Sequence, residues 1–163
     1  MSAVAQKSSP HSPNDGAIAA RQRRLRLLTR AERGRLEQAY AALPQQPGYR
    51  RLKQPETGLA MLRARAGGVG QRFNLGEMTI SRCVVALEAD GAMGVGYVLG
   101  RDQRKAELVA LFDALSQDAA MAAALEASLF APLETELHQA QAARAAKVAA
   151  TKVDFFTMVR GED

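Results

Sequence analysis

The stretch MTISRCVVALEADGAMGVGYVLG, residues 78–100, decides the fold of this chain. Its first part, residues 78–88, is apolar on both alternating faces except at Arg82, which is typical of a central strand. The Ala-Asp-Gly turn at 89–91 predicts an antiparallel hairpin with a second strand at 93–100. One face of that second strand carries Met93, Val95, Tyr97 and Leu99. The other face carries Gly94, Gly96 and Gly100, and this bare surface lets a helix or another backbone approach closely.

Two further strands are expected before this hairpin. GLAMLRARA, residues 58–66, alternates between Ala60, Leu62 and Ala64 on one face and Leu59, Met61 and Arg63 on the other, which indicates an extended strand. A short strand at 49–53 precedes it. The sequence therefore predicts an antiparallel β-meander of three to four strands.

An N-terminal pair of helices is expected over residues 21–43. Thr29 and Glu32 have the spacing of a capping box, which predicts that the second helix begins there. Pro44, Pro47 and Gly48 end it. The candidates for its buried side, and for that of the first helix, are Leu25, Leu28, Leu36, Tyr40 and Leu43.

The last third is helical in pattern. One helix face carries Leu108, Leu111, Phe112 and Leu115. A shorter helix is expected near 118–128, and after Ala131-Pro132 an Ala-rich helix spans 134–151 with only two large apolar side chains, Leu137 and Val148. The terminal run KVDFFTMVRG is typical of an extended segment. The fold class is thus α+β, with a disordered tail at 1–17 and one domain at 18–163.

Composition excludes several classes of protein. The single cysteine, Cys83, rules out an intramolecular disulfide framework, and His11 and His138 are too far apart for zinc-ligand spacing. A self-contained hydrolase would depend on His138 alone, and a lone histidine on such a helix is more often a surface residue. No stretch reaches the roughly 20 apolar residues of a membrane span, and residues 1–17 lack the apolar region of a secretory signal. A cytoplasmic location is expected.

Positive charge is concentrated in residues 21–53, which hold ten Arg or Lys and two Glu. Such a segment could contact nucleic-acid phosphates, but it lacks the interleaved aromatic residues of a base-stacking surface. A solvated face or an acidic protein partner is the more ordinary interpretation. The carboxylates outside this segment show no spacing for a metal or an acid–base pair, so helix caps and salt bridges are expected for Glu56, Asp102, Glu107 and Asp113.

GGVGQRFN, residues 67–74, lies between two expected strands. Its consecutive backbone amides could surround an anion, with Arg72 as a bidentate donor, so the candidate phosphate-binding residues are Gly67, Gly68, Gly70 and Arg72. The stretch is neither a Walker A sequence nor a dinucleotide fingerprint. A long hairpin loop that needs glycine for positive φ is the alternative, and spacing leaves both open.

Five motifs occur together in one order: ETGL (56–59), RARAGGVGQRFNLGEMTISR (63–82), GYVLGRDQRKAELVALFDAL (96–115), APLE (131–134) and KVDFFTMVRG (152–161). Over about residues 20–163 the chain resembles the PhnG family, the small subunits of the bacterial carbon–phosphorus lyase core complex. The tail at 1–17 lies outside the resemblance.

The resemblance implies a role in phosphonate catabolism, in a complex with two copies each of the PhnG, PhnH, PhnI and PhnJ subunits and with the accessory PhnL protein. Such complexes displace adenine from MgATP by a phosphonate at the ribose C1′, which gives α-D-ribose 1-alkylphosphonate 5-triphosphate. MgATP is then a substrate of the complex, and this chain is expected to bind no cofactor or metal and to hold no catalytic residue. The terminal motif is the expected partner interface, through Val153, Asp154, Phe155, Phe156, Met158 and Arg160. A stand-alone nucleic-acid or nucleotide-phosphate binding module is the alternative.

Overall fold

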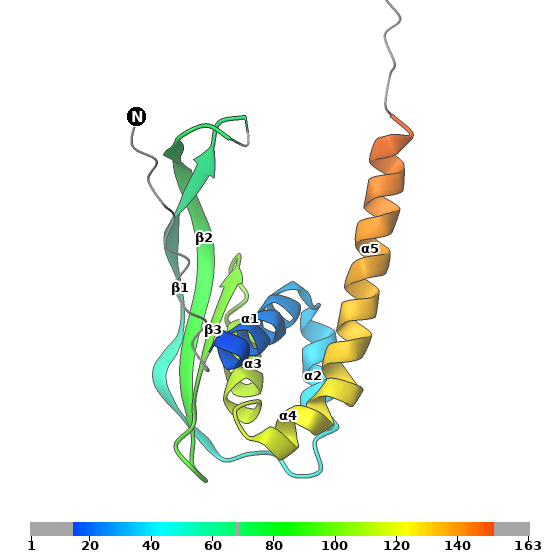
Figure 1. Ribbon diagram of the computed structural model, residues 1–163. Helices are drawn as coiled ribbons and strands as arrows, with labels where there is room; N and C mark the ends of the chain where they lie inside the picture. Colours follow the sequence, from blue (N-terminus) through cyan, green and yellow to red (C-terminus); the bar gives the residue numbers. More distant parts are fainter. Residues whose placement is uncertain (1–14, 68, 152–163) are drawn as a thin grey trace, which may run out of the picture.

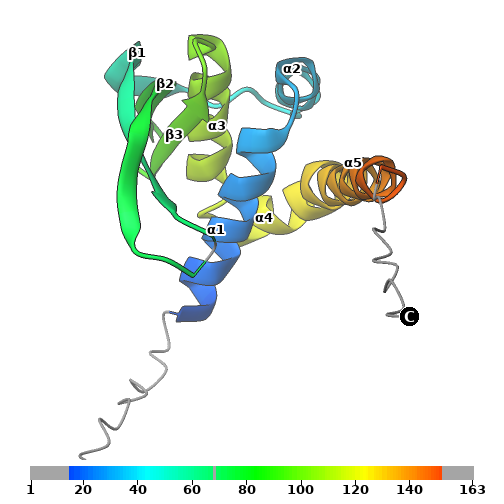
Figure 2. The same ribbon diagram turned by 90° about the horizontal axis from the view of Figure 1, so that it is seen from above.

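The computed structural model describes residues 15–67 and 69–151 as a sheet covered on one face by helices (Figures 1 and 2). The sheet is antiparallel with the order β1-β2-β3. The elements along the chain are α1 (Asp15–Arg30), α2 (Arg33–Ala41), β1 (Tyr49–Arg65), β2 (Arg72–Leu87), β3 (Met93–Leu99), α3 (Gln103–Leu115), α4 (Ala119–Leu125), η1 (Glu126–Phe130) and α5 (Ala131–Ala149). The α+β class and the antiparallel meander are confirmed, with three strands rather than four. The expected final extended segment lies outside the described residues, as do residues 1–14 of the expected tail; α1 begins at Asp15.

β2 is the central strand because it pairs with both neighbours. Its side chains Ser81, Cys83 and Val85 are fully buried beneath the helices. On β3, Tyr97 and Leu99 point to the opposite face, where no helix lies, and remain exposed. The sheet is therefore covered on one face only among the described residues.

Helix α3 packs directly on the glycines of β3. A Cβ atom placed on Gly96 would lie 1.9 Å from the carbonyl oxygen of Ala106, and one on Gly94 would lie 1.9 Å from that of Ala110. These distances are far below any real carbon–oxygen contact, so only glycine permits this approach. The expected close packing against the bare strand face is confirmed.

Helix α3 is the centre of the core. All its residues from Ala106 to Leu115 are buried, because the sheet lies on one side and α1 and α2 contact the other. The amphipathic pattern predicted one buried face, whereas the helix is enclosed all round. The predicted buried residues of the N-terminal pair pack as expected: Leu28 and Leu36 are buried, and Leu25, Tyr40 and Leu43 lie against the core. Leu27 joins them.

The two strands expected at 49–53 and 58–66 are one strand, β1. Its pairing with β2 shifts register between Lys53 and Glu56, and Pro55 lies within that irregularity. A proline there removes no regular ladder hydrogen bond, so the strand continues through it. At the other end β2 begins at Arg72, well before the expected start at Met78. The expected long loop is correspondingly short.

The predicted capping box is wrong. Thr29 lies in the last turn of α1, where its hydroxyl donates to the carbonyl oxygen of Arg26. The cap position of α2 belongs to Glu32, without a side-chain hydrogen bond. Threonine bonds readily to a carbonyl three residues back within a helix, and this local bond competes with capping.

The two C-terminal helices expected on either side of Ala131-Pro132 are joined by a widened helical turn and not by a break. The chain stays helical from Ala119 to Ala149, with the π-helical turn η1 before the proline and a change of direction between α4 and α5 (Figure 1). The amide of Ala131 donates to the carbonyl of Glu126 across this turn. Pro132 follows in the first turn of α5, where its missing N–H costs little.

In the described ranges, no helix has both the length and the apolar character that a membrane crossing requires.

Candidate functional site

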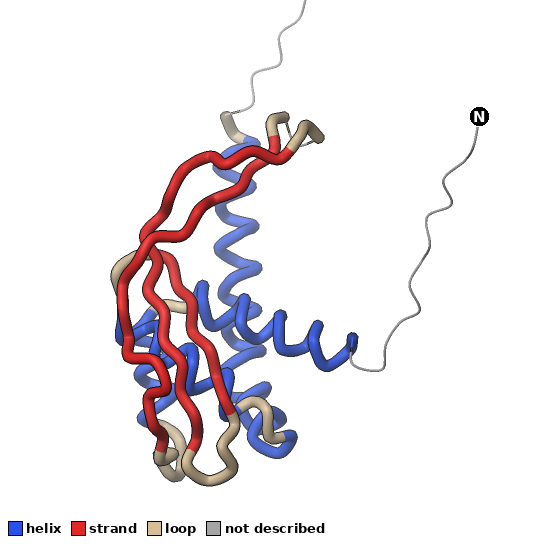
Figure 3. Tube along the Cα trace, turned by 90° about the vertical axis from the view of Figure 1, so that its left-hand side faces the viewer, coloured by secondary structure: helices blue, strands red, loops and turns tan. Residues whose placement is uncertain are grey.

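A two-stranded arm extends from the sheet beyond the end of β3 (Figures 1 and 3). Along the chain, Ile80 is the first β2 residue that pairs with β3, where it lies opposite Leu99. Residues 59–79 therefore form a hairpin of β1 and β2 alone. We call these residues the hairpin arm. None of its described residues is buried. The loop expected over residues 67–74 hides the arm in the sequence, although Phe73 and Leu75 already belong to β2.

The candidate phosphate residues lie at the tip of the hairpin arm. Gly67 has a φ of 57°, as the turn requires. The amide of Gly70 donates to the carbonyl of Ala66 at 2.9 Å, so it is already engaged within the turn. Arg72 is exposed and pairs across the strands with Arg65. Gly68 lies outside the described residues.

The basic segment is partly neutralised within the chain, since six of its ten basic side chains form ion pairs. Arg21 donates two hydrogen bonds to Asp113, at 2.9 and 2.7 Å. Arg23 bridges Glu126 and Glu134, and Arg35 lies 3.5 Å from Glu136. The acidic partners of these three arginines come from the C-terminal half, so charge that is uneven along the sequence is partly balanced in the fold. These ion pairs reduce the charge available to nucleic-acid phosphates, although four of the ten basic side chains have no ion pair among the described residues.

A polar cluster surrounds Glu107 on α3. Its carboxylate accepts hydrogen bonds from Tyr49 Oη at 2.9 Å, Arg104 Nη1 at 2.8 Å and Arg51 Nε. Burial raises the pKa of Glu107, but the three hydrogen bonds together outweigh it and leave the pKa lowered. The carboxylate is therefore ionised and fully engaged, and it ties the start of β1 to α3.

The other three carboxylates also have structural partners, as expected. Asp102 caps α3 by accepting the amide of Lys105 at 2.9 Å. Glu56 pairs with Arg82 and Lys53. Besides holding Arg21, Asp113 accepts the amide of Val95 at 3.0 Å. These contacts leave no free acid–base pair among the four.

Cys83 and His138 offer no nucleophile–base arrangement. Cys83 is fully buried, its thiol donates to the carbonyl of Lys53 at 3.4 Å, and burial raises its pKa to about 11. Such a thiol stays protonated and unreactive. His138 is exposed on α5, as expected of a surface residue. Across 15–67 and 69–151, no three His, Cys, Asp or Glu side chains gather as metal ligands.

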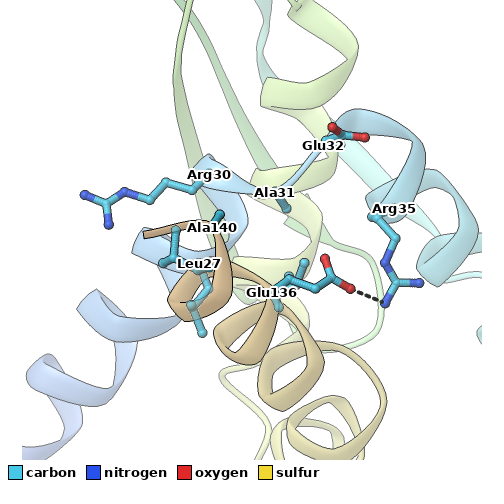
Figure 4. A pocket seen from close by; sticks show the side chains of 9 residues that line it. Leu27, Arg30, Ala31, Glu32, Arg35, Glu136 and Ala140 are labelled. Atoms are coloured by element: carbon cyan, nitrogen blue, oxygen red, sulfur yellow. Dashed lines mark ion pairs between the residues drawn. The ribbon is translucent and has the colours of Figure 1, made fainter. Parts of the chain in front are cut away.

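A cavity of about 240 Å³ lies between α1, α2 and α5 (Figure 4). Leu27, Leu133 and Leu137 line its apolar part, and the ion pair of Arg35 with Glu136 lies at its side. It is smaller than the roughly 300–1,000 Å³ of typical small-molecule sites, and it has no histidine or cysteine in its lining. We interpret the cavity as a packing gap between helices and not as a catalytic site. The expected partner residues from Val153 to Arg160 lie outside the described residues.

Known proteins match this chain over most of its length. The family described as "Phosphonate metabolism protein PhnG" matches residues 19–161. A relative from Rhizobium meliloti (strain 1021), the "Alpha-D-ribose 1-methylphosphonate 5-triphosphate synthase subunit PhnG", is 46% identical over 150 residues, which cover 92% of this chain and 95% of the relative. The match spans the hairpin arm, the helical layer and the terminal motif together. On this evidence the chain belongs to the PhnG family of phosphonate metabolism proteins.

Proposed function

We propose that this chain is an accessory, non-catalytic subunit of the carbon–phosphorus lyase core complex. The observation that carries the proposal is the 46% identity, over nearly the full length of both chains, to a relative named as a subunit of ribose methylphosphonate triphosphate synthase. The complex would displace adenine from MgATP by a phosphonate, with release of adenine from the ribose C1′. The product would be ribose 1-alkylphosphonate 5-triphosphate.

The proposed partners are the PhnH, PhnI and PhnJ subunits, two copies of each with two of this chain, and the accessory PhnL protein. MgATP enters as a substrate of the assembled complex, and this chain is proposed to hold no cofactor of its own. Contact of Gly67, Gly68, Gly70 and Arg72 with phosphate stays a prediction, as does a partner interface at Val153–Arg160.

The arrangement of titratable groups supports an accessory role. Asp113 and Glu107 are committed to arginines, and Cys83 is held protonated. A group that acts as acid, base or nucleophile needs a free position beside a reacting atom. The described residues supply contacts that stabilise the fold instead.

The test measures adenine by chromatography after incubation with MgATP and methylphosphonate. We expect no multiple turnovers from the purified chain alone, and adenine release from the complex of this chain with PhnH, PhnI, PhnJ and PhnL. A complex that lacks this chain is the control and should lose activity. Repeated turnover by the isolated chain would contradict the accessory role, and a complex fully active without the chain would contradict its participation.

A further inference from the structure

We propose that the hairpin arm, residues 59–79, inserts into an apolar groove of another protein subunit, where its arginines meet carboxylates. The inference rests on the proposed function, because the groove is assigned to one of the other core subunits. Among the described residues, the arm differs from the rest of the sheet in having neither a third strand nor a helix against it (Figure 3).

Large apolar side chains of the arm are exposed on both of its faces. Leu59 and Met61 lie on one face, and Leu62 lies on the other. The exposed set, with relative accessibilities from 39% to 93%, is Leu59, Met61, Leu62, Val69, Phe73 and Leu75. Exposed large apolar side chains gathered on one arm in this way mark an interaction site. Since both faces carry exposed apolar side chains, a groove that encloses the ribbon buries more of them than a flat surface would.

The charge of the arm indicates what lines the groove. It carries three arginines, Arg63, Arg65 and Arg72, against one acidic residue, Glu77. Arg65 and Arg72 lie directly opposite each other across the two strands, and like charges in that position destabilise a sheet. No ion pair within the described part of the chain joins these arginines to a carboxylate, whereas Arg21 and Arg23 of α1 are paired with carboxylates of the same chain. Carboxylates of a partner protein would relieve the repulsion.

The apolar residues favour a protein over a phosphate ligand. Arginines alone would suit a nucleotide triphosphate, but a polyphosphate offers nothing to cover Leu59, Met61 and Leu75. A two-stranded ribbon is marginally stable in water without a further layer. A protein groove supplies that layer and the opposite charge together.

The experiment compares two charge-reversal variants of the full chain, each co-expressed with PhnH, PhnI and PhnJ. The test variant is Arg63→Glu with Arg72→Glu. The control is Arg50→Glu with Arg101→Glu, which changes the net charge equally at exposed positions outside the arm. Native mass spectrometry over a dilution series measures association. We expect about tenfold or greater weakening for the test variant and none for the control, since losing charge pairs at a desolvated interface mainly speeds dissociation.

Hydrogen exchange of the unmodified chain provides a second measurement that does not depend on a variant's folding. Amides of residues 59–79 should exchange at least about tenfold more slowly in the complex than in the free chain. Unchanged exchange there, or unchanged association of the test variant, would overturn the inference while the proposed function stands. An intact complex that loses activity with the test variant would assign the arginines to phosphate instead. Failure of the unmodified chain to associate would overturn both proposals.

Discussion

At Gly96, strand β3 and helix α3 touch through backbone atoms. A methyl group there would meet the carbonyl oxygen of Ala106 at 1.9 Å, and a backbone atom cannot move aside without displacing the helix. We expect Gly96→Ala to lower the free energy of unfolding by about 3 kcal/mol, as overpacking of a core does. Urea denaturation measures it. Gly58→Ala, where the new methyl meets nothing within 4 Å, is the matched control in β1 and should change stability by under about 0.5 kcal/mol. Equal effects at the two sites would contradict the argument.

Glu107 makes stability depend on pH. Its pKa is lowered in the folded state from the ordinary 4.5, so its contribution is present above that value and is lost as pH falls through the folded pKa. Glu107→Gln should cost about 1–3 kcal/mol at pH 7, because charge-assisted hydrogen bonds to Arg51 and Arg104 are replaced by weaker ones. The cost should shrink below pH 4. Unfolding curves across pH 3–7 test this, and a cost independent of pH would exclude the ionised carboxylate as its source.

At the scale of elements, α5 is the helix least supported by the rest of the chain. Leu133 is its only buried residue, and every residue from His138 to Ala149 is exposed. A helix without a packed face depends on intrinsic propensity and frays readily. Amides of 140–149 should therefore exchange at least about tenfold faster in the free chain than in the complex, while those of α3 stay protected in both. Exchange measured by mass spectrometry decides it, and equal rates for 140–149 in the two states would show that α5 has no partner.

The alternation of residues along the strands predicted which strand face a helix would approach better than it predicted how long the strands are. The bare face at Gly94 and Gly96 correctly indicated the approach of a helix, because that inference needs only the alternation of a strand. The arm was missed for a different reason. Alternation at Leu59 and Met61 predicts a strand with two faces. It does not predict how far along that strand β3 and the helices extend.

For the whole molecule, the sequence showed that charge is uneven but not where it is balanced. The carboxylates were correctly expected to form caps and salt bridges. Their particular partners, such as Arg21 for Asp113, depend on packing between segments 92 residues apart, and no local pattern encodes that. The same applies to Arg23, whose acidic partners are Glu126, the first residue of the π-helical turn, and Glu134 in α5. The tertiary structure shows that Arg21 and Arg23 of the basic helix are paired within the chain.

These pairings also set an order of events during synthesis on the ribosome. Arg21 emerges 92 residues before Asp113, and Arg23 emerges 103 and 111 residues before Glu126 and Glu134. At about 5–20 residues per second, roughly 5–20 s pass between the synthesis of these arginines and that of their carboxylate partners. The ion pairs of α1 can therefore form only after α3 and α5 have been synthesised.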